Sequence, residues 1–168
     1  MRGYLLDTSV ISAQLDEEHD DHDKIRQAIE QLDPAEPLYL SAMSLAETTM
    51  GLRMVEFFQP SSTKRLKEVV RKARRREAIP VTRHTAMVYA LLKAKLAKCY
   101  LAKPSRKDRP RWVEDWVDKA TGKKLHVDEN DLWMCAQAKE RDLVFVTADD
   151  KIRKRVSKAD PSVRFLVL

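Results

Sequence analysis

Short apolar runs alternate with amphipathic stretches along the chain, and this alternation predicts the secondary structure. Strands are expected at 3–6, 38–41, 143–147 and 163–168, with a strand or extended link at 79–82. Helices are expected at 23–32, 44–57, 63–79, 84–98, 128–142 and 149–156. Strands that alternate with helices are typical of a parallel sheet covered on both faces. We therefore expect one domain spanning 1–168, a three-layer α/β/α fold with a central parallel sheet.

The stretch from about residue 99 to 126 interrupts this pattern. It contains Pro104, Pro110 and Gly122, many basic residues, and Trp112 and Trp116 four positions apart. We interpret it as a basic insertion with one short helix near 111–120. The tryptophans could stack on unpaired bases, but packing of the insertion against the body of the domain is the commoner fate of such residues.

Charge is distributed unevenly along the 168 residues, whose formal net charge is +6. Residues 1–63 carry 4 basic and 12 acidic residues, residues 64–125 carry 20 and 6, and residues 126–168 carry 8 of each. A basic segment of this kind is typical of a phosphate-rich partner, although an exposed helix face explains it equally well. Two distant cysteines and the lack of a long apolar run favour a cytoplasmic protein without membrane association.

Four carboxylates occupy positions that the predicted fold brings to one place. Asp7 and Asp149 follow predicted strands, at the edge where ligands of parallel sheets bind. Glu47 and Asp131 lie on predicted helices beside those strand ends. Converging carboxylates repel one another unless a cation lies between them, and oxygen ligands favour Mg²⁺ or Mn²⁺ over Zn²⁺.

Each of these acids also has a purely structural interpretation. Asp7 and Asp149 could cap the helices that follow, and Asp131 could favour the dipole of its helix. Ser44 followed by Glu47 has the spacing of a capping box. A shared acidic site is the more economical account, because it explains all four residues together.

The motifs Leu6-Asp7-Thr8-Ser9, Ser44-Leu45-Ala46-Glu47, Glu129-Asn130-Asp131 and Thr147-Ala148-Asp149 occur in one order along the chain. In this order they resemble the PIN-domain ribonucleases, most closely the VapC-type toxins of toxin–antitoxin pairs. The resemblance implies an endoribonuclease that depends on Mg²⁺, with Mn²⁺ able to substitute, that acts on RNA, forms a homodimer and is inhibited by a cognate antitoxin protein.

The same resemblance assigns roles to individual residues. The catalytic and metal-binding acids would be Asp7, Glu47, Asp131 and Asp149. Supporting residues would be Thr8, Asn130, Thr147, Asp128 and Asp150, where the two extra acids leave open which member of each neighbouring pair points inward. Basic residues that could contact RNA are Arg71, Lys72, Arg74, Arg75, Arg76, Arg106, Lys107, Arg109 and Arg111.

Two other functions fit parts of the pattern. A non-catalytic RNA-binding module with a vestigial acidic site would share the basic segment, but the intact set of four acids argues against it. A PIN nuclease that processes RNA, rather than a toxin, would share the whole site.

Overall fold

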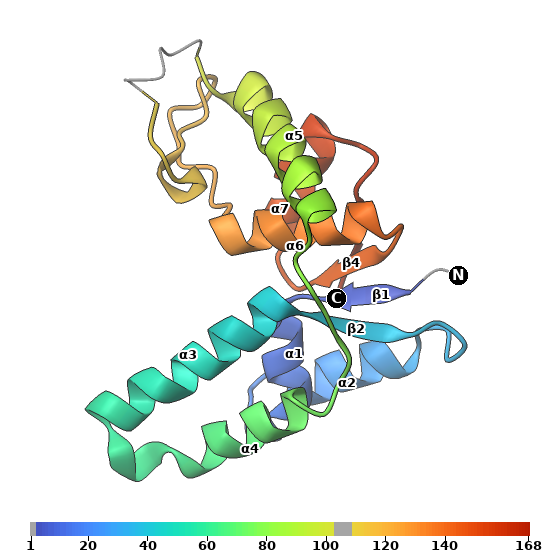
Figure 1. The fold of residues 1–168 in the computed structure, drawn as a ribbon, viewed down its shortest axis with the longest axis vertical. Coiled ribbons are helices and arrows are strands. Elements are labelled where there is room, and N and C mark those ends of the chain that lie inside the picture. The colour runs from blue at the N-terminus through green and yellow to red at the C-terminus, as the bar shows by residue number, and fades with distance from the viewer. Residues whose placement is uncertain (1–2, 103–108) are drawn as a thin grey trace.

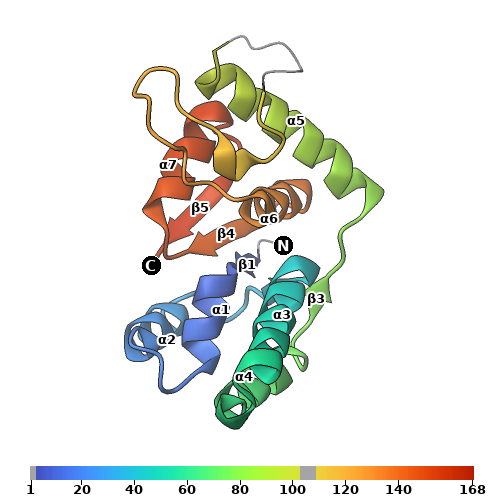
Figure 2. The same ribbon diagram turned by 90° about the vertical axis from the view of Figure 1, so that its left-hand side faces the viewer.

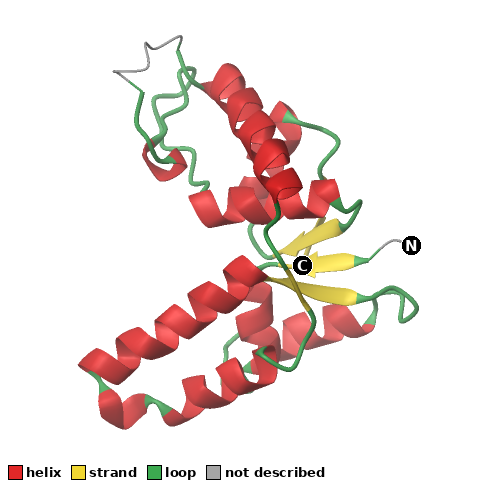
Figure 3. Cartoon of the chain, in the orientation of Figure 1, coloured by secondary structure: helices red, strands yellow, loops and turns green. Residues whose placement is uncertain are grey.

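The computed structural model describes residues 3–102 and 109–168, and its strands form one parallel sheet in the order β3–β2–β1–β4–β5 (Figure 3). β1 is central and pairs with β2 on one side and β4 on the other. The expected parallel α/β architecture is confirmed. The strand bounds are β1 (Tyr4–Leu6), β2 (Leu38–Ser41), β3 (Ala78–Ile79), β4 (Val144–Thr147) and β5 (Arg164–Val167).

Helices cover both faces of this sheet. One group lies on one face and a second group on the opposite face, as two perpendicular views show (Figures 1 and 2). The first group contains α1 (Thr8–Leu15), α2 (His22–Glu30), α3 (Ala42–Phe58) and α4 (Lys64–Ala73). The second contains α5 (Arg83–Tyr100), α6 (Glu129–Glu140) and α7 (Asp150–Ala159).

Neighbouring residues of the central strand serve different cores. Leu5 packs in the cluster formed with α5, α6 and α7, while Leu6 packs in the cluster formed with α1, α2 and α4. This division follows from strand geometry, because successive side chains point to opposite faces of a sheet. The fully apolar sequence of β1 is therefore explained by burial on both sides.

Several predicted helix boundaries were wrong. α1 begins at Thr8, one residue after β1, in a segment that lies outside the predicted helices. α3 begins at Ala42 and is capped by Ser41, whose Oγ accepts a 2.9 Å hydrogen bond from the Met43 amide, so Ser44 is not its cap. α4 ends at Ala73 rather than near residue 79, because the chain turns there to enter β3.

The described part of the insertion is largely irregular. The helix expected near 111–120 is only a short 3₁₀ turn, η2 (Val113–Asp115). Outside the insertion, another such turn, η1 (Pro60–Ser62), follows α3. Trp116 is 1% exposed and its Nε1 donates to the Pro110 carbonyl at 2.9 Å, whereas Trp112 is exposed. Packing against the domain is thus confirmed for Trp116, and it anchors the insertion beside α5.

The strand order defines where a ligand site is expected. β2 and β3 extend from one side of β1, and β4 and β5 from the other, so the connections diverge between β1 and β4. Ligands of open parallel sheets bind beyond the carboxyl ends of the strands at such a point. No helix in the described residues is long and apolar enough to cross a bilayer.

Candidate active site

Asp7 lies at this divergence point, immediately after β1. Its side chain does not cap α1; its Oδ2 accepts hydrogen bonds from Ser9 Oγ at 2.9 Å and Thr147 Oγ1 at 2.8 Å. The capping interpretation of Asp7 is therefore wrong. Burial raises the pKa of the Asp7 carboxyl, and the two hydroxyl donors offset only part of that increase.

Glu47 is positioned by α3, whose N-terminal turns reach the same edge of the sheet. Its Oε2 accepts a hydrogen bond from Thr8 Oγ1, and its Oε1 accepts one from Asn130 Nδ2 at 2.7 Å. The capping-box interpretation of Glu47 is wrong, since the helix begins earlier and the carboxylate points to α1 and α6. Both carboxylate oxygens of Glu47 are thereby fixed by residues from two other elements.

The N-terminus of α6 brings the third acid to the site. Asp128 caps this helix by accepting a 2.8 Å hydrogen bond from the Asp131 amide. Burial, together with the negative charges of Asp7, Asp128 and Glu47, raises the pKa of Asp131 to about 8. This mutual effect means that the acids of β1, α3 and α6 share one environment.

The fourth predicted acid lies at the edge of this group. Asp149 is exposed and caps α7, its Oδ1 accepting from the Lys151 amide at 2.7 Å. Its own amide donates to Thr147 Oγ1 at 3.0 Å, so the hydroxyl that holds Asp7 also joins this segment. Asp150 forms ion pairs with Lys154 and Arg153, which lower the pKa of its carboxyl. These ion pairs hold the Asp150 carboxylate against other residues of its own helix, α7.

The charges of this site fit a divalent cation. In the described chain, none of Asp7, Glu47 and Asp131 forms an ion pair with a lysine or arginine. Asp7 is buried and Glu47 and Asp131 are half-buried. Carboxylates in such surroundings without a positive partner favour protonation or a bound cation, and oxygen donors suit Mg²⁺ or Mn²⁺. Within the described ranges, however, no three acidic, histidine or cysteine side chains are already arranged as metal ligands. Coordination by all three acids would need their side chains to rotate.

The model of the PIN domain family matches residues 4–158, nearly the whole chain. The chain belongs to the PIN-domain family. A comparison with curated protein sequences found no match.

Solved structures confirm the fold of this PIN domain. VapBC2 from Rickettsia felis, bound to a DNA fragment from their promoter, superposes with a TM-score of 0.66 at 16% identity, covering 98% of this chain and 97% of that one. VapBC-5 from Mycobacterium tuberculosis, from the VapBC family of toxin-antitoxin systems, gives 0.64 at 23% identity with full coverage of both chains. FitAcB from Neisseria gonorrhoeae gives 0.59 at 22% identity, covering 97% and 96%.

The basic residues that were predicted to contact RNA differ in their exposure and in whether they form ion pairs. Arg71 is paired with Glu68, and Lys72 donates to Glu17 at 2.9 Å. Arg74 and Arg75 are exposed, and burial lowers the pKa of the partly buried Arg76. Arg106 and Lys107 lie outside the described residues. Arg109 and Arg111 are exposed and line a pocket beside α5.

Two residues near the acids were not predicted as site residues. Ser9 contacts Asp7 directly, and its position two residues after an acid that starts a helix could have indicated this. Lys93 donates to Glu129 Oε1 at 2.6 Å, directly before the Asn130-Asp131 pair of the site. Nothing in the local sequence around Lys93 indicates this contact, because 36 positions separate the partners.

Proposed function

We propose that this PIN domain is an endoribonuclease that uses Mg²⁺, or Mn²⁺ in its place, and that it is the toxin of a toxin–antitoxin pair. The observation that carries the proposal is the convergence of Asp7, Glu47 and Asp131 from three elements at the carboxyl edge of the sheet. Asp149, at the edge of the group, is proposed as an assisting ligand. The family match supports nucleic-acid hydrolysis as the reaction class.

The side chains of the site have separate tasks in this proposal. Asp7, Glu47 and Asp131 would hold the cation, which would supply activation of the attacking water and stabilisation of charge on the scissile phosphate. Thr147 and Ser9 orient Asp7 through its Oδ2, and Thr8 and Asn130 orient Glu47 through its two oxygens. A carboxylate of the group receives a proton of the attacking water, whose oxygen bonds to phosphorus in line with O3′. The P–O3′ bond breaks, which leaves a 5′-phosphate on one product, and O3′ takes up a proton from water to become the 3′-hydroxyl of the other.

The proposed partners follow from the same family. VapBC and FitAB structures resemble this fold throughout its length. VapBC-5 from Mycobacterium tuberculosis belongs to a family of toxin-antitoxin systems, and VapBC2 from Rickettsia felis is bound to promoter DNA. We infer a cognate antitoxin protein, an RNA substrate and a homodimer for this chain, acting in the cytoplasm.

Substitution of Asp7 tests the proposal. Purified wild-type protein is incubated with a panel of tRNA, ribosomal RNA and mRNA in Mg²⁺, in Mn²⁺ and in EDTA. We expect cleavage by the wild type in either metal, none in EDTA, and at least a hundredfold lower rate for Asp7→Asn, corresponding to about 2.7 kcal/mol.

Controls separate a chemical defect from a folding defect. Asp7→Asn keeps the size of the side chain and removes a buried charge, so its thermal midpoint should equal or exceed that of the wild type in EDTA, and its RNA affinity should be retained. Asp115→Asn, an exposed acid of the insertion, is the matched variant and should cleave normally. Full activity of the wild type in EDTA, or of Asp7→Asn in Mg²⁺, would contradict the proposal.

A further inference from the structure

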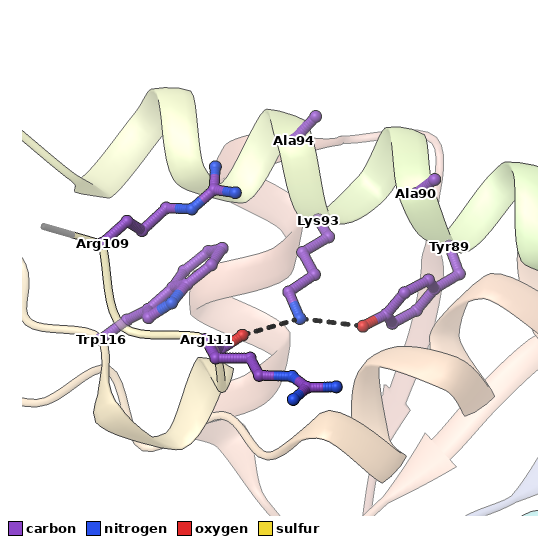
Figure 4. A pocket seen from close by; sticks show the side chains of 7 residues that line it. All are labelled: Tyr89, Ala90, Lys93, Ala94, Arg109, Arg111 and Trp116. Carbon is purple, nitrogen blue, oxygen red and sulfur yellow. Dashed lines mark hydrogen bonds between the residues drawn. The ribbon is translucent and has the colours of Figure 1, made fainter. Parts of the chain in front are cut away.

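A pocket of about 690 Å³ lies between α5 and the described part of the basic insertion. Tyr89 and Lys93 of α5 form one side, and Arg109, Arg111 and Trp116 of the insertion form the other (Figure 4). This volume is in the range of pockets that bind small molecules or single nucleotides. The pocket is separate from the acids of the candidate active site.

The positive charge that this pocket offers comes from its two arginines. Lys93 Nζ donates to Glu129 Oε1 at 2.6 Å, to Tyr89 Oη at 3.0 Å and to the Arg111 carbonyl at 3.4 Å, so it is held within the fold (Figure 4). Neither Arg109 nor Arg111 has a salt bridge to any residue that the structure describes. Guanidinium groups bind phosphate oxygens through paired hydrogen bonds.

The apolar part of the pocket is rigid. The ring of Tyr89 stacks on Trp133 with centroids 3.8 Å apart and planes 2° from parallel. Trp116 is fixed by its hydrogen bond to the Pro110 carbonyl. The guanidinium of Arg111 lies 4.8 Å from the ring of exposed Trp112, which limits its orientations. Flat aromatic walls beside guanidinium groups suit a nucleobase attached to a phosphate.

The pocket adjoins the candidate active site through one turn of α6. Glu129 binds Lys93 on the pocket side, Asn130 binds Glu47, and Asp131 belongs to the acidic group. Consecutive helical residues point about 100° apart around an axis that rises 1.5 Å per residue. Glu129 and Asp131 therefore project about 200° apart, and a strand of RNA that contacts both places would have to pass around the N-terminus of α6.

The geometry points to a nucleotide-binding subsite for the RNA substrate, in which Arg109 and Arg111 hold a backbone phosphate and the walls of the pocket hold its base. This inference rests on the proposed function, because it takes RNA as the substrate. Recognition through stacking and phosphate contact favours a single-stranded region of that RNA. The subsite holds the RNA and takes no part in the chemical step.

Binding of RNA by catalytically inactive protein tests the subsite. Fluorescence anisotropy of a fluorescein-labelled single-stranded RNA of mixed sequence is measured with Asp7→Asn and with Asp7→Asn/Arg109→Ala/Arg111→Ala. We expect roughly tenfold weaker binding for the triple variant. The slope of log K against log salt concentration should become less steep by about 0.7 for each lost phosphate contact. Asp7→Asn/Lys64→Ala/Arg83→Ala removes two exposed positive charges that lie outside the pocket and have no salt bridge to a described residue, and it should bind as tightly as Asp7→Asn.

Each outcome of these binding measurements either supports or contradicts the inferred subsite. Equal loss in the two triple variants would show a general effect of charge and overturn the inference, as would unchanged binding in the pocket variant. Weaker binding of a poly-glutamate peptide without weaker RNA binding would assign the pocket to an acidic protein segment instead. In the active protein, Arg109→Ala/Arg111→Ala should raise KM and leave kcat unchanged. Cleavage by wild-type protein is scored separately, so failure of the nuclease proposal is distinguishable from failure of the subsite.

Discussion

Replacement of Asp131 by Asn should stabilise the metal-free protein at alkaline pH. Burial and the charges of Asp7, Asp128 and Glu47 raise the pKa of Asp131 to about 8, compared with 3.8 for an ordinary Asp. In the folded protein the carboxyl group therefore binds its proton more tightly than in the unfolded chain. Between these two pKa values the unfolded state loses the proton first, so the free energy of unfolding falls as pH rises.

The size of the change in the free energy of unfolding follows from the pKa shift of Asp131. Each pKa unit corresponds to about 1.36 kcal/mol, which gives an upper limit of about 5 kcal/mol at pH 8, about 3 kcal/mol at pH 6 and almost nothing below pH 4. Water that enters around the ionised carboxylate reduces this penalty. We therefore expect Asp131→Asn to gain about 2 kcal/mol or more over the wild type at pH 8.

Urea unfolding in EDTA at pH 5, 6.5 and 8 measures this difference directly. Asp149→Asn is the matched control, because that carboxylate is exposed and Asn caps helices as well as Asp does, so its stability should stay within about 0.5 kcal/mol of the wild type. Mg²⁺ at ten times its Kd should stabilise the wild type by about 1.4 kcal/mol and Asp131→Asn much less. A variant no more stable than the wild type at pH 8, or a gain that is the same at pH 5, would refute the reasoning.

Two further substitutions test contacts around the sheet. Thr147→Val removes the hydroxyl that donates to Asp7 and should cost about 1–3 kcal/mol in urea unfolding at neutral pH, with reduced cleavage; an unchanged midpoint would contradict this role. Asp160 is 2% exposed, and although burial raises the pKa of its carboxyl, hydrogen bonds from Lys139, Ser162 and Lys95 lower it more. That contribution is present above the unfolded pKa and lost as pH falls below about 4, so Asp160→Asn should cost about 3 kcal/mol at pH 7, and equal losses at pH 7 and pH 3 would refute the assignment.

The sheet and the acidic edge could be predicted because burial controls both. β1 and β4 are buried on both faces, so they are apolar runs that end abruptly in polar residues. Because β1 and β4 are parallel neighbours, Asp7 and Thr147 lie at the same carboxyl edge of the sheet, independently of the conformation of the loops. The contact of Thr147 with Asp7 spans 140 positions, yet it follows from the neighbouring places of β1 and β4 in the sheet.

Errors occurred where a local pattern competed with a tertiary contact. The spacing of Ser44 and Glu47 is that of a capping box, but Ser41 ends β2 and caps the helix first, which leaves Glu47 to bind Thr8 and Asn130. The amphipathic pattern of α4 continues beyond Ala73, but pairing of Ala78 with Leu40 in the sheet ends the helix. In both cases long-range packing overrides a propensity worth about 1 kcal/mol.

The fold also alters the interpretation of the uneven charge distribution along the sequence. The acidic and basic segments suggested a metal site at one end of the chain and phosphate contacts in its middle. In the structure, α4 neutralises part of its basic row internally, through Arg71 and Lys72, so this row offers RNA less charge than the sequence indicated. The arginines of the insertion instead line a pocket with Lys93, which binds Glu129, and Glu129 lies two positions before Asp131 on α6. Arginines that form no ion pair with Asp7, Glu47 or Asp131 would remain free to hold a phosphate without neutralising the acids that we propose as metal ligands.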